Sequence, residues 1–153
     1  MPKVLVAEDD LLVADLVELV LIDGGYEVCG IARTVEGGVA LGERHKPNLA
    51  LLDLRLADRG RGTEIAARLD RKGGLGILYA TGIPDRTDLT SDDGDACLDK
   101  PYRPAELVRA LEIAEEMVST GKATRPLPTS FRVLQPPSSS SARRRAANFR
   151  GSR

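Results

Sequence analysis

The chain has 153 residues, of which 42% are hydrophobic and 29% charged, and its formal net charge is −1. This composition fits a soluble globular protein. No apolar run approaches the ~20 residues of a membrane span, and the start of the chain lacks a signal-peptide pattern, so we expect a cytoplasmic protein. The two cysteines, Cys29 and Cys97, lie too far apart for a metal-binding spacing and are expected to be free thiols.

Strand-like and helix-like segments alternate from the start of the chain to residue 118. Residues 3–7 are a short apolar run of strand length, and apolar residues at helical spacing then follow until Gly24 and Gly25 end the helix. Further strands are predicted at 28–32, 49–53, 75–80 and 96–98, and further helices at 35–45, 63–71 and from Pro104 to about 118. This order predicts an α/β fold.

We expect a doubly wound five-stranded parallel sheet of order 2-1-3-4-5 with helices on both faces. The segment between Thr81 and Lys100 departs from the alternation, because it carries Pro84, Gly94 and, between residues 85 and 95, five aspartates, but no apolar stripe at helical spacing. A fourth helix is therefore expected to be short or absent there, with a mobile loop in its place.

Residues 119–153 differ in composition from residues 1–118. They hold eight basic side chains and no acidic one, together with a serine run at 138–141 and arginines at 143–145. Such a segment buries too little apolar surface to offset the entropy of ordering. We therefore predict a folded domain over 1–118 and a basic, disordered Pro/Ser/Arg-rich tail over 119–153, without a DNA-binding domain.

Polar side chains stand at the carboxyl ends of four predicted strands. Glu8 and Asp9 follow the first strand, Asp53 ends the third, Thr81 follows the fourth and Lys100 follows the fifth. Open parallel sheets bind their ligands at this edge, and the predicted strand order makes these four strands neighbours. We expect the five side chains to converge on one crevice.

This set of residues suits phosphoryl transfer. Three close carboxylates repel each other, and a hard divalent cation such as Mg²⁺ relieves the repulsion. A carboxylate beside a bound metal can act as a nucleophile toward phosphorus. The metal, an ammonium group and a hydroxyl can then neutralise the charge of the transferring group.

Each residue also has an ordinary structural interpretation. An acidic residue such as Asp9 or Asp10 after a strand is often a helix N-cap. Thr81 beside Gly82 fits a turn, and Lys100 before a proline fits an exposed lysine. Their joint occurrence in this order favours the site.

Four segments together resemble a known family. They are VLVAEDD, LALLDLRL, ILYATG and LDKPYRPAEL, and they resemble the signature segments of the CheY-like receiver domain of bacterial two-component response regulators. The resemblance covers residues 1 to about 118 and implies a flavodoxin-like fold with Mg²⁺ as cofactor. It also implies a histidine kinase or a histidine phosphotransfer protein as the phosphoryl donor.

The resemblance assigns the metal site and the acceptor. Asp53 corresponds to the phosphoacceptor, and Glu8 and Asp9 correspond to the acidic pair that holds Mg²⁺ together with it. The main-chain carbonyl of Arg55 corresponds to a further metal ligand. Asp10 falls one position beyond the acidic pair and is not assigned to the metal.

The resemblance also assigns the switch. Thr81 corresponds to the switch hydroxyl and Lys100 to the invariant lysine, which is usually followed by a cis peptide bond to proline. The family usually carries an aromatic residue at the position of Cys97, so the usual aromatic switch is not expected; Tyr102 is the nearest aromatic residue. Cys97 is interpreted as a small buried side chain.

The YATG motif and the weak fourth helix resemble a subgroup of stand-alone receivers, many of which pair with histidine kinases of the HWE type. The resemblance implies a protein that is not an enzyme beyond its own phosphorylation and dephosphorylation. It would signal through protein contacts or act as a phosphate sink.

Two alternatives remain open at the level of sequence. One is a Mg²⁺-dependent phosphatase that uses Asp53 as a transient nucleophile, although such enzymes usually carry a second acid where this chain has the basic Arg55. The other is a nucleic-acid-binding regulator that works through its basic tail.

Overall fold

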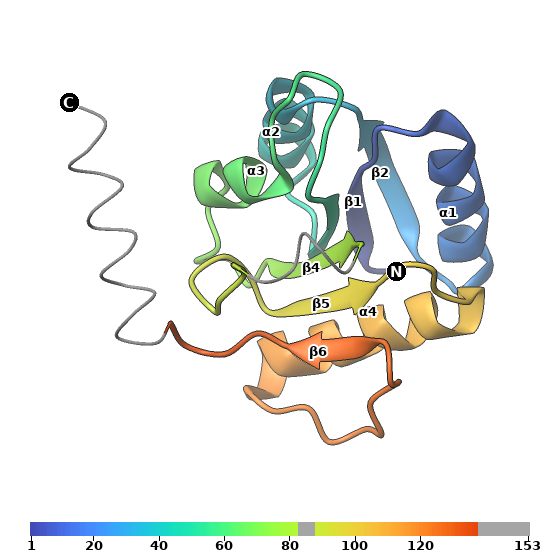
Figure 1. The fold of residues 1–153 in the computed structure, drawn as a ribbon, viewed down its shortest axis with the longest axis vertical. Helices are drawn as coiled ribbons and strands as arrows, with labels where there is room; N and C mark the ends of the chain where they lie inside the picture. Colours follow the sequence, from blue (N-terminus) through green and yellow to red (C-terminus); the bar gives the residue numbers. More distant parts are fainter. Residues whose placement is uncertain (83–87, 138–153) are drawn as a thin grey trace.

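The computed structural model describes residues 1–82 and 88–137 of the chain. Within these residues, six strands form one sheet in the order β2-β1-β3-β4-β5-β6 (Figure 1). The strands are β1 (Lys3–Ala7), β2 (Glu27–Ala32), β3 (Leu49–Asp53), β4 (Gly76–Thr81), β5 (Ala96–Asp99) and β6 (Phe131–Val133). The helices are α1 (Leu11–Asp23), α2 (Val35–His45), α3 (Gly62–Arg68) and α4 (Pro104–Thr120). Strands β1 to β5 pair in parallel in the predicted order.

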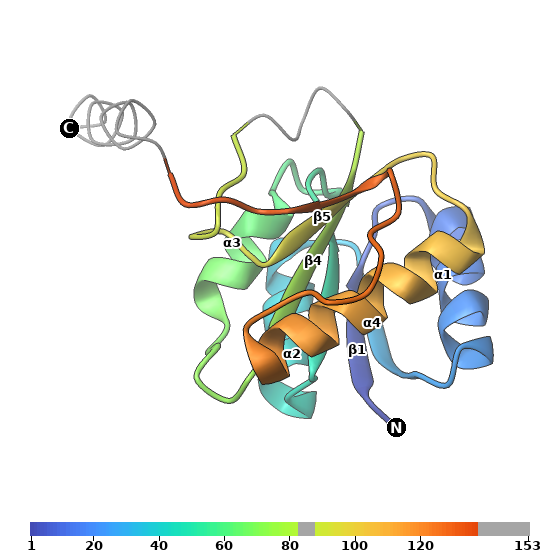
Figure 2. The same ribbon diagram turned by 90° about the horizontal axis from the view of Figure 1, so that it is seen from below.

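The central strands are apolar because both faces of the sheet are covered. All six residues of β4 are buried, and in β3 only Asp53 is partly exposed. One apolar cluster joins α1 and α4 to one face, and a second cluster joins α2 and α3 to the other. Figures 1 and 2 show this three-layer arrangement. Parallel sheets of this kind are buried on both faces.

Helix α1 is unusual because much of its apolar surface faces outward. Its buried residues are Ala14, Val17 and Leu21. Leu12, Leu16 and Leu19 are 76%, 63% and 66% exposed. The periodic leucines that predict the helix are thus not the residues that anchor it to the sheet.

The connection between β4 and β5 contains no helix among its described residues, as the sequence predicted. Residues 88–95 form turns held by hydrogen bonds, such as the 2.7 Å bond from the Tyr79 hydroxyl to the Asp93 carbonyl. The Ile77 amide also donates to Asp95 Oδ2 at 2.7 Å. These contacts tie residues 88–95 to the sheet, which differs from the mobile loop predicted for this part. The prediction for residues 83–87 lies outside the described residues.

The sheet is larger than the predicted five strands. β6 pairs antiparallel with β5, with Leu98 opposite Phe131 and Ala96 opposite Val133. Phe131 and Leu134 are 6% and 5% exposed. The prediction of a disordered tail that starts at residue 119 is therefore wrong for residues 119–137, because two buried apolar side chains and strand pairing hold this part of the chain. The prediction of disorder for residues 138–153 lies outside the described residues.

No helix in residues 1–82 and 88–137 combines the length and apolar character that crossing a membrane requires.

Candidate functional site

The carboxyl ends of β1, β3 and β5 bring one ammonium and two carboxylate groups together. Lys100 Nζ lies 3.1 Å from Asp53 Oδ2 and 3.3 Å from Glu8 Oε2. The side chains of Glu8, Asp53 and Lys100 are 8%, 16% and 29% exposed. The convergence predicted for these three residues is present, with the lysine bridging the acids.

The cluster carries more negative charge than Lys100 balances. Burial and the nearby Asp53 carboxylate raise the pKa of Glu8 to about 7, against the opposing effect of Lys100. Burial alone would lower the pKa of Lys100, but Asp53 and Glu8 together raise it above its ordinary value. Such shifts are typical of functional sites in which like charges are held close together.

Asp9 and Asp10 have different environments despite being adjacent. The Asp10 carboxylate accepts hydrogen bonds from the amides of Leu12 and Val13, so Asp10 is the N-cap of α1. Asp9 is about half exposed, and its Oδ1 lies 3.6 Å from the Arg33 guanidinium. The sequence did not indicate Arg33, which reaches the site from the end of β2.

Thr81 and Arg55 lie next to this cluster. Thr81 is buried at the end of β4, where its hydroxyl donates to the Gly82 carbonyl at 3.2 Å. The Lys100 amide donates to the Thr81 carbonyl at 2.9 Å, which ties the two strand ends together. The Arg55 amide approaches Asp53 Oδ1 at 3.4 Å.

Cys97 and Tyr102 lie on opposite faces of the sheet. Cys97 is fully buried in the cluster beneath α2 and α3. Tyr102 packs against the cluster beneath α1 and α4. The Lys100–Pro101 peptide bond is cis, as the resemblance implied.

The donor atoms at this edge fit a hard divalent cation, although they are not arranged around one. Among residues 1–82 and 88–137, no three His, Cys, Asp or Glu side chains are grouped to hold a metal ion. Lys100 stands between Glu8 and Asp53, while Asp9 is turned toward Arg33. The available donors are carboxylate and carbonyl oxygens, the ligands that Mg²⁺ prefers, and the cluster has excess negative charge.

A family model described as "Response regulator receiver domain" matches residues 4–112, which include the whole of this cluster. The chain belongs to this family.

Curated relatives support this assignment. The receiver is 35% identical over 117 residues to the transcriptional regulatory protein PdtaR of Mycobacterium tuberculosis, covering 73% of this chain and 56% of that protein. It is 30% identical over 108 residues to the phyllosphere-induced regulator PhyR of Methylorubrum extorquens, covering 69% of this chain and 40% of that protein. The chain thus spans about half the length of these two curated relatives.

Solved structures agree. A CheY-like receiver domain protein from Methanospirillum hungatei superposes with a TM-score of 0.70 at 28% identity, covering 80% of this chain and 99% of that one. The response regulator PhyR from Brucella abortus gives a TM-score of 0.61 at 27% identity, covering 78% of this chain and 52% of that one.

An apolar groove runs from α1 to this site. It is lined by Leu16 and Val20 of α1, by Tyr102 and Pro104, and by Lys100 at its polar end. Leu16, one of the exposed leucines of α1, thus lines the same groove as Lys100 of the carboxylate cluster. The helical spacing of these leucines was visible in the sequence, but their exposure was not.

Gly62 supports the backbone of Asp53 from the first turn of α3. A Cβ atom placed on Gly62 would lie 2.2 Å from the Asp53 carbonyl oxygen and 3.1 Å from Leu52 Cβ. Only glycine fits there without moving β3. No local pattern in the sequence indicates this constraint, because it arises from the packing of α3 on β3.

Proposed function

We propose that this receiver accepts a phosphoryl group from a phosphohistidine onto Asp53, in a reaction that requires Mg²⁺. The observation that carries the proposal is the partly exposed Asp53 carboxylate at the carboxyl end of β3, bridged by Lys100 to a buried Glu8. Bound Mg²⁺ would supply charge neutralisation for the transferring group. Glu8, Asp9 and Asp53 would hold it, together with the Arg55 main-chain carbonyl.

The protein's own groups have separate roles in this scheme. Asp53 supplies the attacking oxygen, which bonds to phosphorus while the phosphorus–nitrogen bond of the phosphohistidine breaks and the donor imidazole leaves. Lys100, already 3.1 Å from Asp53 Oδ2, would pair with the phosphoryl oxygens that replace this contact. The Thr81 hydroxyl would turn from the Gly82 carbonyl toward the same oxygens. The output would follow through protein contacts, or the receiver would act as a phosphate sink.

The donor would be a histidine kinase or a histidine phosphotransfer protein, and the YATG motif at residues 79–82 favours a kinase of the HWE type. We also propose the cytoplasm as the compartment, where thiols such as those of Cys29 and Cys97 stay reduced. A profile of phosphotransfer from the purified histidine kinases of the host would identify the cognate donor.

Acetyl phosphate with Mg²⁺ should add one phosphoryl group to the purified protein, and chelation of Mg²⁺ should abolish the addition. The reason is that the carboxylate cluster needs a cation before a further anion can approach. Intact-mass spectrometry measures the addition, and fragmentation locates it. Labelling that persists without divalent metal, or that maps to a residue other than Asp53, would contradict the proposal.

The same preparation separates the two alternative functions. Repeated turnover of small phosphoesters would favour a phosphatase. Salt-sensitive DNA binding that disappears when residues 138–153 are deleted would favour a nucleic-acid-binding regulator.

The exposed face of α1 suits docking of the donor protein. Exposed apolar patches mark interaction sites, and the groove beside Leu16 ends at Lys100, next to the acceptor. The charged residues of α1, Asp15, Glu18 and Asp23, are all acidic. A donor helix with apolar anchors and flanking basic residues would complement this face.

Replacing both Leu12 and Leu16 with serine should slow phosphotransfer from the cognate kinase at least about tenfold, a loss of about 1.4 kcal/mol of binding free energy. Labelling by acetyl phosphate should stay unchanged, because both side chains are exposed and apolar, and the contacts of Lys100 with Asp53 and Glu8 do not involve them. Leu127→Ser is the matched control, since Leu127 is exposed in another part of the molecule. Equal losses with both phosphoryl donors would argue against a docking role.

A further inference from the structure

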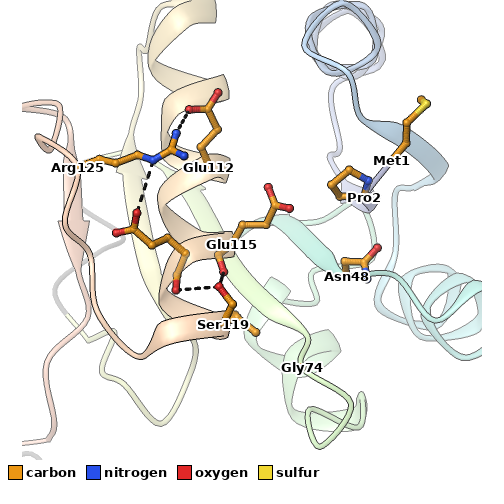
Figure 3. A pocket seen from close by; sticks show the side chains of 10 residues that line it. Met1, Pro2, Asn48, Gly74, Glu112, Glu115, Ser119 and Arg125 are labelled. Carbon is orange, nitrogen blue, oxygen red and sulfur yellow. Dashed lines mark hydrogen bonds and ion pairs between the residues drawn. The ribbon is translucent and has the colours of Figure 1, made fainter.

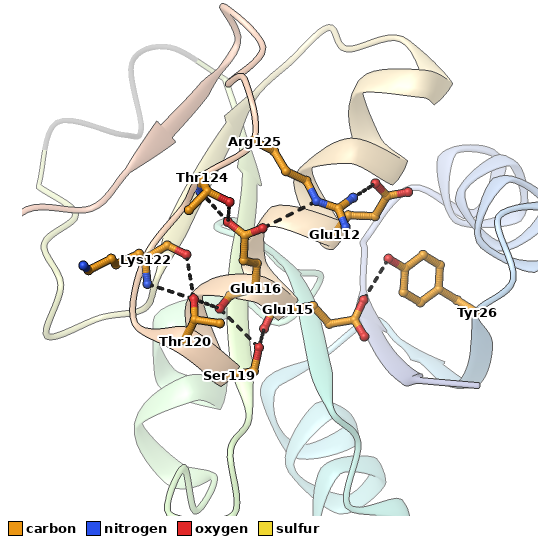
Figure 4. A network of polar contacts seen from close by, with 9 residues as sticks. All are labelled: Tyr26, Glu112, Glu115, Glu116, Ser119, Thr120, Lys122, Thr124 and Arg125. Carbon is orange, nitrogen blue, oxygen red and sulfur yellow. Dashed lines mark hydrogen bonds and ion pairs between the residues drawn. The ribbon is translucent and has the colours of Figure 1, made fainter.

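The chain after α4 folds back along that helix. We call residues 121–137 the C-terminal segment. Thr124 donates to the Glu116 carboxylate through its amide and its hydroxyl, and Arg125 Nη1 lies 2.5 Å from Glu112 Oε2. Ser130 then donates to Glu106 in the first turn of α4. Figure 4 shows the contacts of Thr124 and Arg125. Together with the Ser130 contact, they place the C-terminal segment along α4 from the end of the helix back to its first turn.

The first anchor of the C-terminal segment lies far from the candidate site. Arg125 joins Glu112 at a pocket that is also lined by Met1, Pro2 and Asn48 (Figure 3). These residues lie at the amino ends of the strands, opposite to Asp53. We therefore expect this anchor to stay in place when the carboxylate cluster changes.

The second anchor is β6, which is short and lies at an edge of the sheet. Phe131 belongs to the apolar cluster beneath α1 and α4, and Leu134 belongs to the cluster on the other face. Beyond β6, the Leu134 amide donates to the Asp95 carbonyl at 3.0 Å, and the Ser91 amide donates to the Gln135 carbonyl at 2.8 Å. A three-residue edge strand belongs to the least stable part of a fold.

The candidate site and β6 meet at two consecutive residues of the chain. The Asp99 amide donates to the Ser130 carbonyl at 2.9 Å, and the next amide, that of Lys100, donates to the Thr81 carbonyl at 2.9 Å. The Lys100 side chain in turn bridges Asp53 and Glu8. One peptide unit therefore separates the contact with the C-terminal segment from the contact with the site.

We infer that phosphorylation of Asp53 releases β6 from β5 and uncovers the β5 edge as the surface through which the receiver signals. The inference rests on the proposed function. A phosphoryl group on Asp53 places new negative oxygens farther from β3, so Lys100 and Thr81 must shift to meet them. Asp99 is the residue before Lys100, so a shift of Lys100 also moves the Asp99 amide. The hydrogen bond from this amide to the Ser130 carbonyl is then the first contact with the C-terminal segment to weaken. Switches commonly convert such small shifts into ordering or release of a segment.

The uncovered edge has the properties of a docking site for an extended strand. Residues 96–99 would present unpaired amide and carbonyl groups, beside the apolar surfaces that Phe131 and Leu134 now cover. An edge of this kind adds a strand from a partner through main-chain hydrogen bonds. The C-terminal segment would stay tethered by Arg125 and would rebind after dephosphorylation.

Hydrogen exchange of single amides tests the inference on the whole chain. The amides of Asp99, Leu134 and Ser91 report on the C-terminal segment, and those of Thr81 and Lys100 report on the site. Adding Mg²⁺ with beryllofluoride, which mimics the phosphoryl group, should shift the site resonances. It should also speed exchange at the three reporter amides at least about tenfold, while the amides of β1 and β3 stay protected. The Asp53→Asn variant should show neither change.

A pair of variants tests the reverse direction of the coupling. Because coupling between two sites is reciprocal, Phe131→Ala should speed exchange at the reporter amides without beryllofluoride and should tighten beryllofluoride binding. Leu127→Ser, in the same segment but exposed, should change neither. Shifted site resonances with unchanged or slower exchange at the reporter amides would overturn the inference and leave the proposed function intact. Absence of any shift at the site would overturn both.

Discussion

The Asp53→Asn variant should take up no phosphoryl group from acetyl phosphate or from a phosphorylated kinase, whereas the wild-type protein should take up one. The amide of asparagine is not a nucleophile toward phosphorus, and no other carboxylate of the cluster is placed to replace it. Glu8 is buried and bridged by Lys100, and Asp9 faces Arg33. Intact-mass spectrometry after incubation with each donor measures the loss.

The loss should be chemical and not a consequence of unfolding. The Asp53 carboxylate helps to raise the pKa of Glu8, because the two negative charges repel each other. Replacing this carboxylate with a neutral amide removes the repulsion, while the Lys100–Glu8 ion pair remains. The free energy of unfolding should therefore change by less than about 1 kcal/mol.

Asp10→Asn is the matched control for this variant. Asparagine caps a helix as well as aspartate does, so this variant should fold and label like the wild-type protein. Full labelling of Asp53→Asn, or loss of labelling in Asp10→Asn, would contradict the assignment of these two residues.

The Gly62→Ala variant should be less stable by about 2 kcal/mol and should label about a hundredfold more slowly. Its new methyl group would meet the Asp53 carbonyl oxygen at 2.2 Å, so the helix or the strand must move by about 1 Å. Overpacking of this kind costs roughly 1–3 kcal/mol, and the helix propensity of alanine returns at most about 1 kcal/mol. A displacement of about 1 Å in a reacting group slows catalysis about a hundredfold. Chemical denaturation and the rate of acetyl phosphate labelling measure the two effects.

Gly73→Ala is the matched control for this prediction. A Cβ atom on Gly73 would meet nothing within 4 Å. The free energy of unfolding of this variant should therefore stay the same or rise slightly. If Gly62→Ala labelled at the wild-type rate, the backbone of Asp53 would not depend on the close contact with α3.

The sequence alone determined the parallel sheet and the location of the candidate site. Strands buried on both faces need continuous apolar runs, and such runs at residues 3–7, 49–53 and 75–80 can be recognised without a structure. The polar residues that end these runs must lie at one edge, because parallel strands place their carboxyl ends together. The grouping of Asp53, Glu8 and Lys100 follows from this rule.

Local signals left the roles of adjacent residues open, and the tertiary structure decided them. Asp9 and Asp10 are the same amino acid in consecutive positions, and either fits an N-cap. The direction in which the chain leaves β1 turns the Asp10 carboxylate onto the α1 amides and Asp9 toward Arg33. This direction depends on the packing of α1 on the sheet, which no local pattern records.

Only the tertiary structure decided which apolar residues are buried. The periodic leucines of α1 predicted a helix but lie exposed, since the sheet accepts the face that carries Ala14, Val17 and Leu21. Conversely, Phe131 and Leu134 lie in a segment whose composition predicted disorder, yet both are buried. Burial depends on what lies opposite a side chain in space. Phe131 and Leu134 lie against β5, the strand that would otherwise form the edge of the sheet, which comes about thirty-five residues earlier in the chain.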